Sequence, residues 1–314
     1  MGKKKKKKKK QSQAAPTPTR RQCGTMEAHF RMLEQHPEFR QAEANIEALT
    51  QRSLLLADDT IVRPQKVVIP VVVHVVYKKE TQNISPKQIK SQIRVLRKDF
   101  RAKNADINSV PSAWQGLVKN SRVGFRLATT DPSGNPTKGI TRTKTGRDSF
   151  GANDSVKFAA SGGADAWPSD RYLNMWVCQL SGGLLGYAQF PGGPAETDGV
   201  VVTQTGFGTK GTATAPFDLG RTTTHEVGHW LNLRHIWGDA NNCVASDFAD
   251  DTPTQRTPNT GKPAFPHVSC DNGPNGDMFM NYMDYVDDDS MFMFSAGQVA
   301  RMRACLAGPR RSFL

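Results

Sequence analysis

Residues Thr224–Asp239 read THEVGHWLNLRHIWGD, and this stretch predicts both the fold and the chemistry. His225 and His229 are four residues apart, so on a helix their side chains share one face and can hold one metal ion. Glu226 follows the first histidine directly, where a helix can aim its carboxylate at a water molecule beside the metal. The stretch therefore predicts a helix that carries two metal ligands and a general base.

A third histidine, His235, lies six residues beyond His229. It could not reach the same ion if the helix continued straight, so the helix must end and the chain must bend back. We expect this bend at Asn232, because asparagine tolerates the left-handed backbone better than most residues other than glycine.

A second motif, Asn281–Tyr285 with the sequence NYMDY, follows about fifty residues later. The two motifs together resemble the metzincin zinc peptidases, whose pattern H-E-x-x-H-x-x-G-x-x-H is followed downstream by a Met-turn. Asn232 stands where that pattern has glycine. The segments HEVGHWLNLRHIWGD and NYMDYVDD are most similar in sequence to the pappalysin family, and the resemblance covers roughly residues 20–309.

The resemblance implies a role for each motif residue. His225, His229 and His235 would hold one catalytic zinc ion and leave a fourth position open. Glu226 would accept a proton from the attacking water and pass it to the leaving amine. Met283 would lie beneath the metal as the Met-turn residue without binding it. Tyr285 matches a tyrosine that contacts zinc or the oxyanion in several metzincins, so we expect it to stabilise the transition state.

The fold expected from this resemblance is α/β (α+β), in the two-lobed metzincin arrangement. The upper lobe would hold a twisted, mixed five-stranded sheet with a backing helix and the active-site helix. The lower lobe would be mostly irregular and close with a C-terminal helix. Apolar and β-branched runs predict strands at residues 69–77, 123–128, 172–177 and 198–203. The resemblance implies a further edge strand upstream of the zinc helix, for which residues 186–193 are the candidate. Helices are expected from Ser85, from about Arg221 and from Ser295. His74 lies within the first strand, and we interpret it as a packed strand histidine.

Most of the net positive charge lies in an N-terminal run of lysines. The formal net charge is +13, of which Lys3–Lys10 supply eight, so the rest of the chain carries +5. We expect residues 1–20 to be a disordered Lys-rich tail, residues 21–62 a pro-segment, and residues 63–314 the zinc peptidase domain. No apolar run is long enough to span a membrane, and no signal peptide is readable.

Cys23 begins the triplet Cys23-Gly24-Thr25, just before the first expected helix. In pro-peptidases of this family a cysteine at this place caps the zinc. A thiolate is a strong zinc ligand and can fill the position meant for water. We therefore expect Cys23 to bind zinc in the latent form. The alternatives are a surface thiol and one half of a disulfide.

Two segments are expected to bind substrate. Gly186, Tyr187 and Ala188 belong to the candidate edge strand, where an extended peptide would pair through main-chain hydrogen bonds. Asp289, in the acidic run after the Met-turn, is the family position expected to favour Arg or Lys just after the cleaved bond. This preference predicts self-processing in the linker, such as between Val62 and Arg63. The alternatives are an ordinary edge strand and solvated loop acids.

The loop after the third histidine is rich in oxygen ligands. The segment SDFADDTPT, with Asp247 and Thr252, is a candidate structural calcium site because calcium prefers carboxylate and carbonyl oxygens. It does not match an EF-hand, and known calcium sites of the family support it. Five cysteines leave at least one unpaired. The resemblance suggests secretion, and a disulfide between Cys243 and Cys270 would agree with it, although two free thiols are the alternative.

The leading hypothesis is thus a secreted zinc endopeptidase made as a self-processed zymogen. We expect protein or peptide substrates, no nucleic-acid partner, no membrane span and a monomer. One competing hypothesis is a zinc-containing binding protein without activity, against which the intact Glu226 argues. Another is a nucleic-acid or membrane-surface binder that uses the lysine tail, whose affinity would fall steeply with salt. A zincin with a distant glutamate as third ligand is disfavoured by His235.

Overall fold

The computed structural model describes residues 18–56 and 65–314. The tail Lys3–Lys10 and the predicted cut between Val62 and Arg63 lie outside the described residues. Two helices come first, α1 (Thr25–Gln35) and α2 (Pro37–Leu55), and Pro37 is the first residue of the second. We call residues 18–56 the N-terminal segment and residues 65–314 the main domain.

The main domain is built on a six-stranded, mostly parallel sheet. Its strands are β1 (Val67–Tyr77), β2 (Val123–Leu127), β3 (Ile140–Lys144), β4 (Leu173–Cys178), β5 (Gly186–Ala188) and β6 (Val200–Thr203). The order is β2-β1-β4-β6-β5, with β3 also paired to β1. Within this sheet, only β5 runs antiparallel to its neighbour, β6. β5 is an edge strand and lies next to the helix α6 (Arg221–Trp230).

The expectation of five strands was wrong by one, because β1 is long enough to pair twice on the same side. β2 pairs with Val67–Val71, and β3 pairs with Val73–Tyr77. The sequence of β3, ITRTK, is polar and half-exposed, so it lacks the apolar run from which the other strands were predicted. The edge strand β5 also ends five residues earlier than expected, at Ala188.

The helices of the main domain are α4 (Pro86–Asp99), α5 (Ser112–Gln115), α6 (Arg221–Trp230) and α7 (Ala296–Ala307). Ser85 and Ser295 cap α4 and α7 as predicted, each accepting a hydrogen bond from the backbone N–H three residues on. A two-stranded pair, β7 (Thr260–Gly261) and β8 (Tyr285–Val286), lies in the irregular lower part. In the described residues, no helix is long and apolar enough to cross a bilayer.

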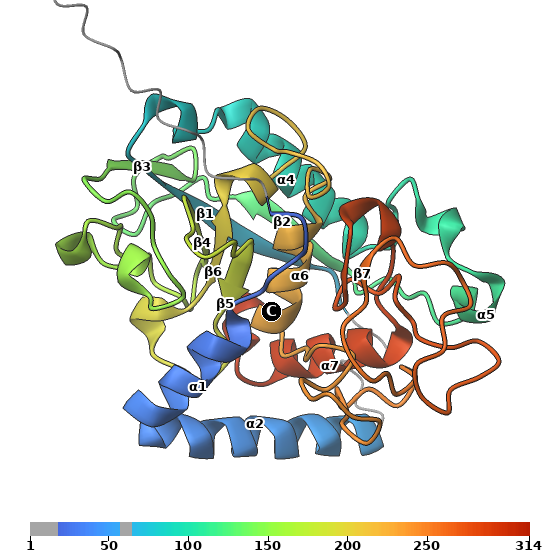
Figure 1. Ribbon diagram of the computed structural model, residues 1–314. Coiled ribbons are helices and arrows are strands. Elements are labelled where there is room, and N and C mark those ends of the chain that lie inside the picture. The colour runs from blue at the N-terminus through green and yellow to red at the C-terminus, as the bar shows by residue number, and fades with distance from the viewer. Residues whose placement is uncertain (1–17, 57–64) are drawn as a thin grey trace, which may run out of the picture.

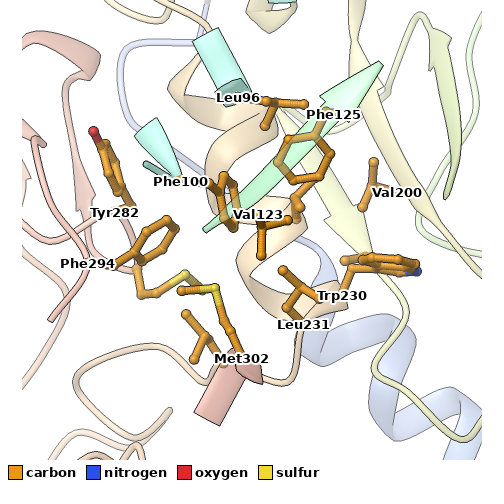
Figure 2. Close-up of a cluster of buried hydrophobic side chains, with 14 of the residues drawn as sticks. Leu96, Phe100, Val123, Phe125, Val200, Trp230, Leu231, Tyr282, Phe294 and Met302 are labelled. Carbon is orange, nitrogen blue, oxygen red and sulfur yellow. The ribbon is translucent and has the colours of Figure 1, made fainter. Parts of the chain in front are cut away.

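The main core joins one face of the sheet to α4, α6 and the segment after the Met-turn. Figure 2 shows Leu96 and Phe100 from the α4 region beside Val123 and Phe125 of β2, with Tyr282, Phe294 and Met302 on the other side of the cluster. All are buried. This packing fixes α6 against the sheet, and therefore fixes the histidines that α6 carries.

His74 is a packed residue, as the sequence analysis interpreted it. It is buried, its two ring nitrogens contact Thr141 Oγ1 at 2.8 Å and Asn174 Oδ1 at 3.0 Å, and its ring stacks on Trp176. Its polar atoms are satisfied within the sheet, so it is not available as a ligand.

The N-terminal segment lies across the main domain. In Figure 1 the blue chain leading into α1 passes beside β5 and α6, and α2 lies below α7. Glu47 of α2 and Arg301 of α7 form a two-pronged ion pair with distances of 3.0 and 2.7 Å. The N-terminal segment therefore contacts both the sheet edge and the lower part of the molecule.

Candidate metal centre and cleft

Three histidines converge at the end of α6. His225 and His229 lie on the helix, and Asn232 takes φ 70°, the left-handed conformation that the sequence predicts for the bend. His235 thereby returns to the other two. The three Nε2 atoms lie 3.0 to 3.2 Å apart. Three ligands at about 2.0–2.1 Å from a tetrahedral zinc ion would be about 3.4 Å apart, so the arrangement fits zinc closely.

The hydrogen bonds behind the rings orient their lone pairs toward a common point. His225 Nδ1 donates to the carbonyl of Tyr282 and His229 Nδ1 to the carbonyl of Leu233, both at 2.7 Å. His235 Nδ1 contacts the carboxylate of Asp239. Because these acceptors take the Nδ1 proton, all three Nε2 atoms present lone pairs to one another. Converging lone pairs require a cation, so the donor set itself indicates a metal site.

Burial keeps the imidazoles of His225 and His229 neutral, as metal ligands must be. The pKa values of His225 and His229 are well below the usual range, first because of burial and then because a positive charge on His235 would lie close by. Neutral imidazoles can donate their lone pairs to a cation at any physiological pH.

Cys23 adds a sulfur ligand to the three histidines. The ligand atoms of Cys23, His225, His229 and His235 all lie within 4.8 Å of one another. Gly24, the next residue, donates from its N–H to the carbonyl of Gly186 at 2.8 Å. A side chain at Gly24 would bring its Cβ to 2.9 Å from Ala152, so glycine permits this close approach.

Glu226 lies at the opening of this centre and is covered by the N-terminal segment. Its Oε2 accepts a hydrogen bond from the hydroxyl of Thr25 at 3.0 Å and contacts Cys23 Sγ at 3.4 Å. Burial raises the pKa of Glu226 to about 8. A Cβ at Gly186 would approach Glu226 Oε1 to 2.8 Å, so β5 can pass this carboxylate only with glycine there.

Tyr285 and Met283 lie as the Met-turn motif predicts. The Tyr285 hydroxyl donates to the backbone carbonyl of Cys23 at 3.5 Å, and its ring packs on His225 and His235. Met283 is fully buried under α6, where a Cβ on Gly228 would meet its sulfur at 2.4 Å. The tyrosine therefore reaches a peptide carbonyl in the cleft, and the methionine packs beneath the helix.

The edge strand binds the N-terminal segment through its backbone. In addition to the contact of Gly186, the N–H of Ala188 donates to Thr25 Oγ1 at 2.9 Å. Tyr187 differs, since its ring is fully buried in a second core cluster with Trp176. Of the three residues expected to bind substrate, Gly186 and Ala188 present main-chain groups to the cleft, and the Tyr187 side chain belongs to the core.

The acidic run after the Met-turn offers a second candidate beside Asp289. Asp289 is half-exposed and pairs with Lys262. Asp288 instead is fully buried, and its Oδ1 lies 2.5 Å from a guanidinium nitrogen of Arg21. The turn at Asp288–Ser290 directs neighbouring carboxylates to different sides, which the sequence alone does not reveal. Asp288, which already holds a guanidinium group, is therefore a further candidate for recognising a basic side chain.

Arg21 is buried and lies two residues before Cys23. Its guanidinium also donates to Thr222 Oγ1 at 3.0 Å and to the carbonyl of Val286 at 3.3 Å, and it stacks over Phe217. Arg21 and Thr25 were not predicted as site residues from the sequence. The available signal was that both lie two residues from Cys23, the candidate zinc ligand.

The loop after the third histidine is held by a disulfide between Cys243 and Cys270. Asp247 is buried, its Oδ1 accepts from Thr252 Oγ1 at 2.8 Å, and burial raises its pKa to about 7. Its Oδ2 is buried without a hydrogen-bond partner among the described residues. Cys23, Cys178 and Cys305 are free thiols, and the last two are buried.

Comparison with known proteins places the chain in a family. Residues 159–307 match the family model of peptidase M43, described as pregnancy-associated plasma protein-A. An extracellular metalloprotease of Arthroderma gypseum is 31% identical over 238 residues, which cover 73% of this chain and 69% of that protein. Extracellular metalloprotease 1 of Coccidioides posadasii is 41% identical over 139 residues, but the match spans only 48% of its length and 41% of this chain.

Solved structures give the same result. The mature mirolysin of Tannerella forsythia, in complex with a cleaved peptide, is 51% identical with a TM-score of 0.77, over 79% of this chain and 96% of that one. A promirolysin mutant of the same organism is 46% identical with the same TM-score, over 88% of this chain and 94% of that one. The chain therefore belongs to the pappalysin family of metzincin metalloproteases.

Proposed function

We propose that this protein is a secreted zinc endopeptidase, made as a latent precursor, that cleaves peptide bonds before Arg or Lys. The convergence of three Nε2 lone pairs beside Glu226 is the observation that carries the proposal. When bound, zinc supplies Lewis-acid chemistry, polarising a carbonyl group and acidifying water. Relatives named extracellular metalloproteases support secretion.

The residues of the chain itself supply proton transfer, stabilisation of the transition state and binding of the substrate. Glu226 holds a proton at its carboxylate and transfers it to the leaving amine. The Tyr285 hydroxyl donates to a peptide carbonyl, as it does to that of Cys23, and so stabilises negative charge on the oxygen. Gly186 and Ala188 hold the extended peptide by main-chain hydrogen bonds. Asp288 binds the basic side chain that follows the cleaved bond.

The test is cleavage of a proteome-derived peptide library by the self-processed protein, with cut sites read by mass spectrometry. We expect cuts before Arg and Lys that stop when a chelator is added and return with zinc. Zinc-loaded, processed protein that cuts no peptide would refute the proposal and favour a zinc-containing binding protein.

Latency is proposed to reside in the N-terminal segment, with Cys23 as the zinc ligand that is displaced on activation. Cys23→Ala removes this ligand, so the precursor should process itself faster by about tenfold or more, which corresponds to a loss of about 1.4 kcal/mol in cap binding. The appearance of the processed form is followed by gel and mass spectrometry. Gln22→Ala, at an exposed neighbouring side chain, is the control. Equal rates for all three proteins would contradict the role of Cys23.

A structural calcium ion is proposed at Asp247 and Thr252. The unpartnered Oδ2 of Asp247 is a buried carboxylate oxygen that a cation would satisfy. A saturating ion should raise the melting temperature by about 5 °C. Asp247→Asn should abolish this shift, whereas Asp250→Asn, at an exposed carboxylate, should keep it. A calcium-induced shift that survives Asp247→Asn would place the ion elsewhere.

A further inference from the structure

Four ion pairs join the N-terminal segment to the main domain. They link Arg21 to Asp288, Arg31 to Asp154, Glu43 to Arg234 and Glu47 to Arg301. In each pair, one charged side chain belongs to the main domain and the other to the N-terminal segment, which is released in the proposed activation. In the proposed activation the N-terminal segment leaves, and each main-domain charge then loses this partner. A charge with no other polar partner in the main domain would become free to bind substrate.

Three of the four charges keep a partner within the main domain. Asp288 also accepts from the N–H groups of Leu219 and Arg221. Asp154 keeps the buried Lys157, whose Nζ lies 2.7 Å from Oδ1, and Arg301 keeps the carbonyl of Phe248.

Arg234 differs from them. Its polar partners among the described residues are Glu43 and, weakly at 3.9 Å, the sulfur of Met26. Both belong to the N-terminal segment. Within the described part of the main domain, Arg234 has only an aromatic neighbour, since its guanidinium lies over the ring of Phe190 at 4.4 Å.

Phe190 holds this guanidinium beside the zinc centre. The Phe190 ring packs edge-on against the ring of His229, with centroids 5.5 Å apart. Phe190 also follows β5 by two residues, and Arg234 precedes the third ligand, His235. Arg234 is therefore positioned by rigid parts of the site. Its side chain is 19% exposed while the N-terminal segment covers it.

The position of Arg234 along the cleft follows from the path of the N-terminal segment. Arg21 enters the Asp288 pocket on one side of the metal centre, Cys23 lies at the centre, and Met26 reaches Arg234 beyond it. Figure 1 shows the chain passing β5 and α6 before it enters α1. If the Asp288 pocket takes the residue after the cleaved bond, Arg234 faces the residues before that bond.

We propose that Arg234 forms a second specificity site, which takes an acidic side chain of the substrate before the cleaved bond. The proposal rests on the proposed peptidase function. A planar guanidinium fits a carboxylate through two parallel hydrogen bonds, and Glu43 occupies this place in the precursor. The enzyme would then recognise two charged side chains of the substrate, an acidic one before the cleaved bond and a basic one after it.

The experiment compares peptides that share one Arg after the cleaved bond and carry Glu, Gln or Lys at successive positions before it. Processed wild type should cut the best-placed Glu peptide with a kcat/KM about five- to tenfold above its Lys counterpart. Arg234→Gln should remove this ratio, and Arg234→Glu should invert it. Arg94→Gln, an exposed arginine on α4, is the matched control and should keep the wild-type ratio.

The outcomes separate this inference from the proposed function. If wild type cuts none of the peptides, the peptidase proposal fails. If it cuts the Glu, Gln and Lys peptides equally at every position, the peptidase stands and the Arg234 site is refuted. Because Arg234 lies beside a zinc ligand, zinc content and melting temperature are measured for each variant.

A second measurement in the precursor does not depend on the peptides. Glu43→Arg should speed self-processing, and combining it with Arg234→Glu should restore the wild-type rate. A double variant as fast as Glu43→Arg alone would refute the pairing.

Discussion

Replacing Glu226 with glutamine should lower kcat about a hundred- to ten-thousandfold while zinc stays bound. Glutamine has nearly the same shape and can still accept a hydrogen bond at its amide oxygen, but it cannot take up a proton from water. Its neutral side chain also leaves the three imidazoles and their supporting carbonyls in place. The loss should therefore appear in turnover and leave the fold and the metal content unchanged.

The measurement compares initial rates of peptide cleavage by wild type and variant. Because the variant should not process itself, its precursor is processed by immobilised wild type, and the new N-terminus is verified by mass spectrometry. Glu80→Gln, at an exposed carboxylate, is the matched control and should retain full activity. A zinc-loaded Glu226→Gln enzyme within about tenfold of the wild-type rate would contradict the role of Glu226 as the base.

Asp288→Asn should reduce kcat/KM for peptides with Arg after the cleaved bond about hundredfold or more. The carboxylate of Asp288 is fully buried against the guanidinium of Arg21, and removing one partner of a buried ion pair costs about 3–5 kcal/mol. Asparagine keeps an oxygen that can accept from Leu219 or Arg221, so the variant should fold. Peptides with an apolar residue at the same position should lose much less.

Asp289→Asn provides the control from the same acidic run. Its carboxylate is half-exposed and bound to Lys262, so its loss should leave the preference for Arg unchanged. If Asp289→Asn removes the preference and Asp288→Asn does not, the expectation drawn from the sequence is right and the proposal for Asp288 is wrong. Melting temperatures of both variants show whether a loss comes from unfolding.

The features predicted correctly are those set by local spacing. Two histidines one helical turn apart must share a face, and the bend that recovers His235 needs a residue tolerant of positive φ, which Asn232 supplies. The buried strands were predicted because their apolar runs are continuous. β3 was missed because its stability comes from pairing with the second half of β1 and not from its own side chains.

The features that were missed depend on contacts between distant residues. Arg21 and Asp288 are 267 positions apart, and no local pattern links them. Three consecutive aspartates after Val286 look equivalent in sequence, and only the turn at Asp288–Ser290 decides which carboxylate is buried. The same holds for Arg234, whose neighbour Glu43 lies on a separate helix.

The helix α2 ends at Leu55 and β1 begins at Val67, so the chain between them is the covalent link from the N-terminal segment to the main domain. A cut in this link would leave in place the contacts described above between the N-terminal segment and the main domain. It changes an intramolecular equilibrium into a bimolecular one, and the effective concentration falls from the millimolar range of a short tether to that of the free peptide in solution. In the proposed activation, the released segment would leave the site for good once it is diluted below its dissociation constant or degraded.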